Sequence, residues 1–146
     1  MNSVSEATDL SIAASRPARS TIFCDKAPAP LGTYSQAVRV GDIIFLAAQT
    51  PVVPGTNQIA EGGFEGQVRQ TFQNLRTMAE GCGGTLADVV QVTVYITEIE
   101  KFSLMNLIMA EFFPQPYPAR TTVGAANLAR GTLVAIDAIM SLSKSA

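Results

Sequence analysis

The chain has 146 residues, 47% of them hydrophobic, and its 10 basic and 12 acidic side chains give a formal net charge of −2. This length fits one compact domain, and the weakly acidic charge disfavours binding to nucleic acid, which requires a basic surface. The sequence has no histidine, which excludes serine triads, cysteine–histidine dyads and histidine-based zinc sites. We expect no cofactor and no metal, so any chemistry must use arginine, tyrosine, asparagine, carboxylates, backbone groups or water.

The N-terminal segment differs in composition from the rest of the chain. Residues 1–19 are rich in serine and alanine without a sustained period, so we expect a flexible extension before a single domain at 20–146. The extension lacks the pattern of a secretory signal, and no apolar run approaches the roughly 20 residues of a membrane span. We therefore expect a cytoplasmic protein without membrane contact. Cys24 and Cys82 have no metal-ligand spacing and are expected to be buried apolar side chains.

The first half of the domain predicts three strands and one helix. A short β-prone run at 21–24 precedes a proline-rich loop, and two further β-prone runs at 35–40 and 43–50 flank a Gly-Asp pair, as in a hairpin. Over 64–80 apolar side chains recur every three or four residues, which indicates an amphipathic helix. The glycines that follow are typical of a helix end.

The second half predicts three more strands and a second helix. Residues 89–97 alternate apolar and polar side chains, as in a strand with one face on a core. A helix is expected over 102–113, and two final strands at 119–126 and 133–142 are expected to form a second hairpin. The order predicts an α+β fold with two helices packed on one face of a mixed sheet. The strand segment 43–48 is apolar on both faces, so we expect the other sheet face to pack against further subunits in a homo-oligomer.

Arg120 is the most informative candidate for a binding residue. It follows Pro118 and Ala119 at the start of a strand of small and apolar residues, where a guanidinium can anchor a carboxylate through two parallel hydrogen bonds. A structural ion pair with Asp137 or Glu111 explains the same residue equally well.

Several short segments occur in an order that resembles one protein family. They are Gly-Thr-Tyr-Ser-Gln-Ala at 32–37, Gly-Asp-Ile-Ile-Phe at 41–45, Gln-Thr-Pro at 49–51, Val-Thr-Val-Tyr-Ile at 92–96, Phe-Phe at 112–113 and Tyr-Pro-Ala-Arg-Thr at 117–121. Over about residues 20–142 the chain resembles a divergent member of the Rid family (YjgF, reactive-intermediate deaminases). The resemblance implies a chorismate-mutase-like α+β fold, a homotrimer whose sheets form a barrel, and ligand clefts between subunits. It also implies hydrolysis of imine or enamine intermediates to 2-keto acids and ammonia.

The resemblance further implies roles in substrate binding for individual residues. Arg120 matches the arginine that binds the substrate carboxylate. Tyr34 and Asn106 match a tyrosine and an asparagine of the same cleft. Ala47 and Ala48 lie where archetypal members have a Ser-Gly pair that lines it.

Two positions differ from the archetypal members in ways that affect the chemistry. Thr122 lies where they have a cysteine, and Ala135 lies where they have the glutamate that orients the attacking water. Alanine can neither hold water nor deliver a proton. Asp137, two residues later and about 7 Å away on the same strand face, either replaces this group, matches another family acid, or has a structural role such as pairing with Arg130 or with buried backbone.

Three functional interpretations remain open from the sequence. The leading one is a hydrolase that deaminates imines or enamines, with the substrate carboxylate on Arg120 and water held by Thr122 or by backbone groups. Alternatively, a pocket reshaped by Ala47, Ala48, Thr122 and Ala135 would serve a larger unsaturated amino acid such as 2-aminomuconate. The third interpretation is a small-carboxylate-binding or regulatory trimer without catalysis.

Overall fold

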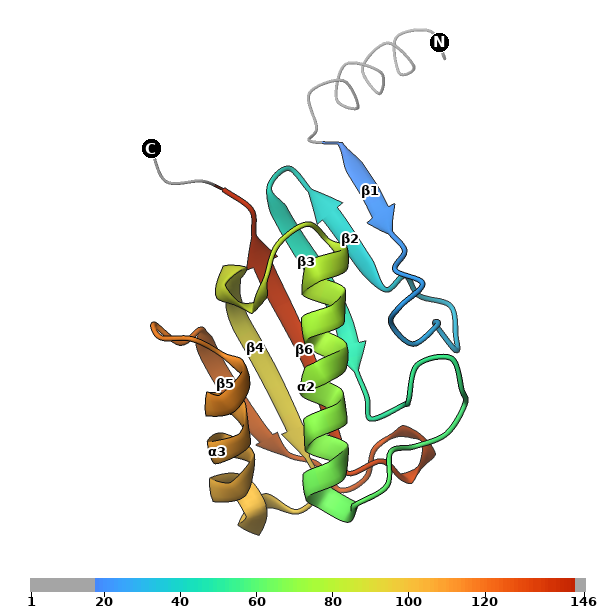
Figure 1. Cartoon of the computed structure of the whole chain (residues 1–146), viewed down its shortest axis with the longest axis vertical. Helices are drawn as coiled ribbons and strands as arrows, with labels where there is room; N and C mark the ends of the chain where they lie inside the picture. The colour runs from blue at the N-terminus through green and yellow to red at the C-terminus, as the bar shows by residue number, and fades with distance from the viewer. Residues whose placement is uncertain (1–17, 144–146) are drawn as a thin grey trace, which may run out of the picture.

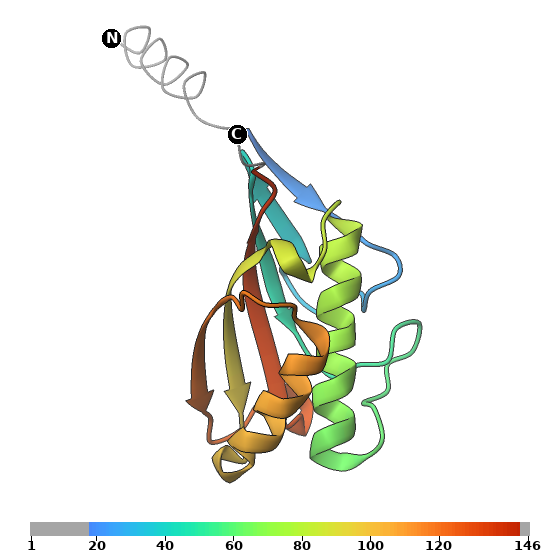
Figure 2. The same ribbon diagram turned by 60° about the vertical axis from the view of Figure 1, so that its left-hand side comes forward.

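The computed structural model describes residues 18–143, in which one mixed sheet carries both long helices on one of its faces (Figures 1 and 2). The strands are β1 (Arg19–Ile22), β2 (Ala37–Val40), β3 (Ile43–Gln49), β4 (Val89–Ile96), β5 (Ala119–Gly124) and β6 (Val134–Ser141). The helices are α2 (Gly63–Gly81) and α3 (Phe102–Phe112), with short 3-10 turns at Leu86–Asp88, Ile99–Lys101 and Ala129–Gly131. The predicted α+β fold is confirmed. The extension expected at 1–19 falls outside the described residues as far as residue 17, and Arg19 already belongs to β1.

The strand order is β1-β2-β3-β6-β4-β5, so the expected hairpin between the last two strands is wrong. β6 lies between β3 and β4 and is antiparallel to both, whereas β5 forms the sheet edge, parallel to β4. Burial explains the difference, because Val134, Ile136 and Met140 of β6 are fully buried while β5 is largely exposed. The α3 segment provides the crossover that a parallel β4–β5 pair requires.

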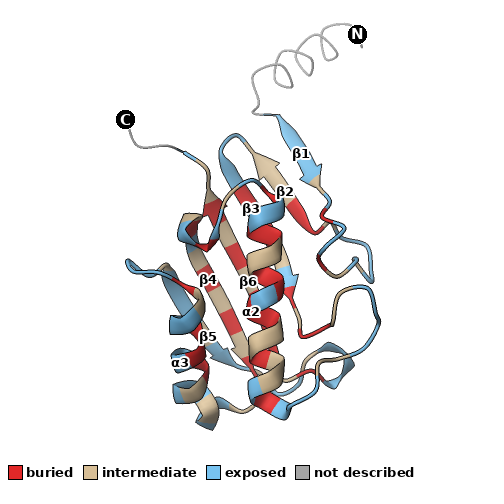
Figure 3. Cartoon of the chain, in the orientation of Figure 1, coloured by how far each residue is buried: buried red, intermediate tan, exposed pale blue. Residues whose placement is uncertain are grey.

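The core lies between the helices and the central strands, where Figure 3 shows the buried residues. α2 contributes Phe72, Leu75 and Met78, which are fully buried. The ring of Phe72 stacks on Phe112, with 5.5 Å between the ring centroids, and meets the edge of Phe113 at 6.0 Å. These aromatic contacts fasten the C-terminal end of α3 to α2 and so fix the start of the segment that leads to β5.

The sheet face away from the helices is partly apolar and uncovered in the single chain. Cross-strand partners share a face, and the pairs Val38 with Phe45, Phe45 with Ile139, and Tyr95 with Ala135 lie on this one. Phe45 is 48% exposed. We call this surface the open face; it is the face expected to contact further subunits. Between residues 18 and 143 no helix combines the length and the apolar character needed to cross a membrane.

Candidate active site

Arg120 projects from β5 toward α3. Its strand partner is Val92, which is fully buried on the helix-covered face, so the arginine side chain lies on that face as well. One guanidinium nitrogen, Nη1, donates to Oδ1 of Asn106 at 2.6 Å and lies 3.5 Å from Sδ of Met109. The guanidinium carbon lies 5.2 Å from the centroid of the Phe102 ring, a cation–π distance. Neutral groups of α3 therefore orient the guanidinium.

Neither ion pair considered for Arg120 from the sequence is present. Glu111 accepts a hydrogen bond from Arg69, which lowers the pKa of the Glu111 carboxyl and raises that of the guanidinium. Asp137 lies on the open face, because its partner on β4 is Thr93, which is adjacent to the buried Val92. Among residues 18–143, Arg120 forms no salt bridge. Its positive charge is thus available to an anionic ligand.

A pocket of about 380 Å³ opens beside this guanidinium. It is lined by Asn106, Met109, Ala110, Tyr117, Pro118 and Arg120. Its volume is in the range of small-molecule sites. The guanidinium N–H groups of Arg120, which lie between apolar and aromatic side chains, can bind a small carboxylate through two parallel hydrogen bonds. Thr122 lies two residues beyond Arg120 on the same face of β5, and its buried Oγ1 has no hydrogen-bond partner within the described chain.

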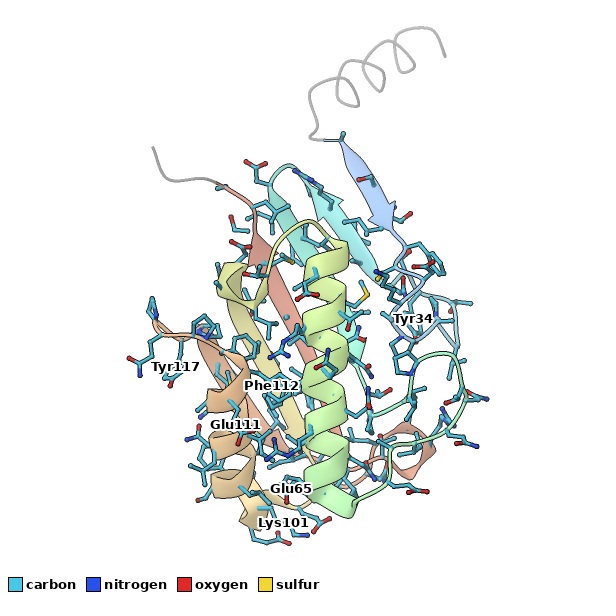
Figure 4. The ribbon with its side chains drawn as sticks, in the orientation of Figure 1. Tyr34, Glu65, Lys101, Glu111, Phe112 and Tyr117 are labelled. Carbon is cyan, nitrogen blue, oxygen red and sulfur yellow. The ribbon has the colours of Figure 1, made fainter. Side chains whose placement is uncertain are left out.

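Tyr34, Ala47 and Ala48 line a different and much smaller hollow, which shares no residue with the Arg120 pocket. Tyr34 is 53% exposed, and its hydroxyl accepts a hydrogen bond from the backbone N–H of Leu31 at 3.2 Å. Figure 4 shows Tyr34 and Tyr117 on opposite sides of α2. Because β6 and β4 separate β3 from β5, three strand spacings, about 14 Å, lie between the two groups.

Two buried amides to which the sequence assigned no role hold this second region in place. The side chain of Gln36 accepts from the backbone N–H of Cys24 at 2.7 Å and donates to the carbonyl oxygen of Cys24 at 3.1 Å. Asn74 of α2 donates to the carbonyl oxygens of Thr50 and Val52, both at 2.8 Å. For Asn74, the available sequence signal was a carboxamide within the mostly apolar buried face of α2.

A β-bulge in β3 shifts the register between β3 and β6 at Ala47 and Ala48. Leu46 pairs with Ala138 and Gln49 with Ile136, so the two residues Ala47 and Ala48 face the single residue Asp137. Ala135 lies on the same open face, 9% exposed, opposite Tyr95. One chain therefore unites Arg120 with Asn106 but leaves Tyr34, Ala47, Ala48 and Ala135 elsewhere.

Comparisons with known proteins agree with this architecture. The family model described as Endoribonuclease L-PSP matches residues 24–141. A 2-iminobutanoate/2-iminopropanoate deaminase from Dermatophagoides farinae is 39% identical over 114 residues, which are 78% of this chain and 89% of that protein. The crystal structure of RidA from an Antarctic Psychrobacter species has 40% identity and a TM-score of 0.81, covering 84% of this chain and 99% of its own. The structure of E. coli TdcF with bound serine has 30% identity and a TM-score of 0.80, covering 85% and 99%.

Proposed function

The chain belongs to the Rid family, whose members include the matched RidA, and from this membership we propose that it hydrolyses a reactive imine or enamine to a 2-keto acid and ammonia. The observation that carries the proposal is the guanidinium of Arg120, oriented by Asn106 and free of any acidic partner within residues 18–143. The activity named for the Dermatophagoides farinae relative supports the same reaction.

The first step is binding of an amino-acid-derived substrate through its carboxylate. Two N–H groups of Arg120 donate to the two carboxylate oxygens, which fixes the position and the plane of the adjacent imine carbon. Asn106 keeps the guanidinium in this orientation through its 2.6 Å hydrogen bond. Tyr117 and Met109 form the walls against which the substrate side chain packs. This arrangement converts an encounter in solution into attack within an oriented complex.

The second step adds water across the C=N bond. The resulting carbinolamine loses ammonia and leaves the keto group of the product. Thr122 is suited to hold a polar group during this step, because its buried Oγ1 has no partner within residues 18–143 and such groups normally find one.

The complete cleft requires a second copy of the chain. We assign the protein a homotrimer in which the hollow lined by Tyr34, Ala47 and Ala48 of one subunit lies against the Arg120 pocket of its neighbour, with the open faces of the subunits packed together. The uncovered apolar side chains of the open face support this assembly, as does the separation of the two residue groups within one chain. Cyclic packing of three subunits then creates three equivalent clefts.

A substrate panel tests this function and separates it from its two alternatives. 2-Iminopropionate and 2-iminobutyrate are generated in situ, their capture by semicarbazide is followed, and 2-aminomuconate is assayed in parallel. The protein and semicarbazide compete for the imine, so a lower yield of semicarbazone from the small imines in the presence of the protein supports the proposal. Activity on 2-aminomuconate alone would favour a site for a larger unsaturated amino acid. Binding of 2-ketobutyrate without turnover of any of the three would favour a small-carboxylate-binding trimer.

A further inference from the structure

Imine hydrolysis is fastest when a basic group orients the water and carries its proton to the departing nitrogen. With no histidine in the chain, a carboxylate is the natural choice. Half of the acidic residues between 18 and 143 have partners in the structure. The paired ones are Asp42 with Arg39, Glu65 and Glu111 with Arg69, Glu98 with Lys101, and Asp88 with the backbone of Thr85.

The other five carboxylates accept no hydrogen bond and form no salt bridge with any residue between 18 and 143. They are Asp25, Glu61, Glu80, Glu100 and Asp137. Four of them are exposed at loops or helix ends, whereas Asp137 lies half-buried within the central strand β6. Arg130, considered as its partner from the sequence, instead donates to the backbone oxygen of Asn57. Asp137 is thus an unpaired acid at a position where an acid is costly to place.

The β-bulge of β3 places Asp137 beside the second group of site residues. Ala47 and Ala48 face it across the β3–β6 pair, and each has only a methyl side chain. On β4 its partner is Thr93, which presents a hydroxyl on the same face. Ala135 precedes it by two residues on that face. Small side chains thus border the carboxylate on β3 and on one side along β6, where Ile139 is the neighbour on the other side. Bulges of this kind commonly reorient residues next to active sites.

We propose that Asp137 is the carboxylate that holds the hydrolytic water, and that it acts on a substrate bound to Arg120 of the neighbouring subunit. The assignment rests on the proposed function. The water oxygen forms a bond to the imine carbon while one water proton passes through Asp137 to the nitrogen. Asp137 then takes the hydroxyl proton of the carbinolamine and delivers it to the nitrogen. The C–N bond breaks, the C=O bond forms, ammonia leaves, and Asp137 is again a carboxylate.

Substitution of Asp137 separates chemistry from binding. In Asp137→Asn, kcat should fall about 100-fold or more, the usual scale for loss of a general base, while KM and the affinity for 2-ketobutyrate stay near the wild-type values. Asp137→Glu keeps a carboxylate and should retain more activity than Asp137→Asn. Asp42→Asn is the matched control, because it makes the same change at the exposed turn at the far end of β3, and it should leave kcat unchanged.

Mixed trimers test whether the two residues act in one cleft from different subunits. Arg120→Ala and Asp137→Asn subunits, each with its own tag, are co-expressed in equal amounts, and the mixed assemblies are purified through both tags. Every cyclic trimer that contains both variants has one cleft with an intact arginine and an intact aspartate, which is about one third of its clefts. Activity should therefore recover to roughly a third of wild type, although each variant alone is nearly inactive.

The outcomes separate failure of this inference from failure of the proposed function. Wild type without activity on any imine would overturn both. An active wild type with an Asp137→Asn variant whose kcat lies within about twofold of it would overturn the role of Asp137 alone. If both single variants are inactive and the mixed trimers recover nothing, the shared cleft is wrong. Size-exclusion chromatography of each variant verifies that the assembly is intact. If Asp137→Asn does not assemble, Asp137→Glu is tested in its place, and an intact Asp137→Glu trimer without turnover would equally overturn the catalytic role of Asp137.

Discussion

The hydrogen bond between Arg120 and Asn106 provides a quantitative test of ligand binding. Asn106→Ala removes the Oδ1 acceptor that lies 2.6 Å from Nη1 of Arg120. Hydrogen bonds to charged groups contribute about 1.5–3 kcal/mol, and since this pair is exposed to solvent, the lower end applies. A loss of about 1.4 kcal/mol corresponds to a tenfold weaker affinity for a carboxylate ligand. Met109 and Phe102 still contact the guanidinium, so binding should weaken without being abolished.

Asn106→Asp instead introduces a negative charge at the same contact. A carboxylate at this position would bind the guanidinium of Arg120 directly and compete with the ligand for its donors. The affinity should therefore fall by more than the roughly tenfold loss expected for Asn106→Ala. Part of this loss should be relieved at high ionic strength, because salt screens an exposed ion pair.

Isothermal titration calorimetry with 2-ketobutyrate measures these affinities. Asn127→Ala is the matched control, because Asn127 is exposed and its side chain makes no hydrogen bond within residues 18–143. It should bind like wild type. If Asn106→Ala binds within about twofold of wild type, or if Asn106→Asp binds as tightly as wild type, orientation of Arg120 by α3 does not contribute to ligand binding.

Two further predictions concern the core and the buried thiol. Phe72→Ala should lower the free energy of unfolding by about 3–5 kcal/mol, because this fully buried ring contacts both Phe112 and Phe113. Urea denaturation measures this free energy, and a change below about 1 kcal/mol would contradict the packing of the ring. Burial, followed by the effect of Cys24, raises the pKa of the Cys82 thiol to about 11, so alkylation of folded Cys82 by iodoacetamide at pH 8 should be slow and should accelerate about tenfold per pH unit up to that value. A rate at pH 8 equal to that of the urea-unfolded chain would contradict this burial.

Local patterns predicted the secondary structure well, and the strand order poorly, for the same reason. Apolar periodicity and the terminal glycines are local, so the helix expected at 64–80 is observed at Gly63–Gly81. Pairing between strands is not local. The final strand lies between β3 and β4, which precede it by many residues, and neighbouring strands in the sequence suggested a hairpin with β5 instead. Only the relative burial of the two final strands, which the completed sheet determines, distinguishes the two arrangements.

In the candidate site, too, the sequence identified individual residues but not the contacts that depend on strand pairing. Residue type and family resemblance identified Arg120 and Asn106, and the structure brings these two into contact. The β-bulge that places Ala47 and Ala48 opposite Asp137 depends on the register between β3 and β6. No local pattern in either strand encodes that register, so the sequence left several roles open for Asp137.

Turnover of a defined imine by wild type and by Arg120→Ala tests the central claim most directly. 2-Iminobutyrate is generated in situ, and its hydrolysis is followed through the loss of semicarbazone formation. The account predicts that wild type hydrolyses the imine well above the rate in buffer, and that Arg120→Ala, with its assembly intact, does not exceed the buffer rate. Equal acceleration by both proteins would contradict a site built on the guanidinium of Arg120, and no acceleration by either would contradict imine hydrolysis itself.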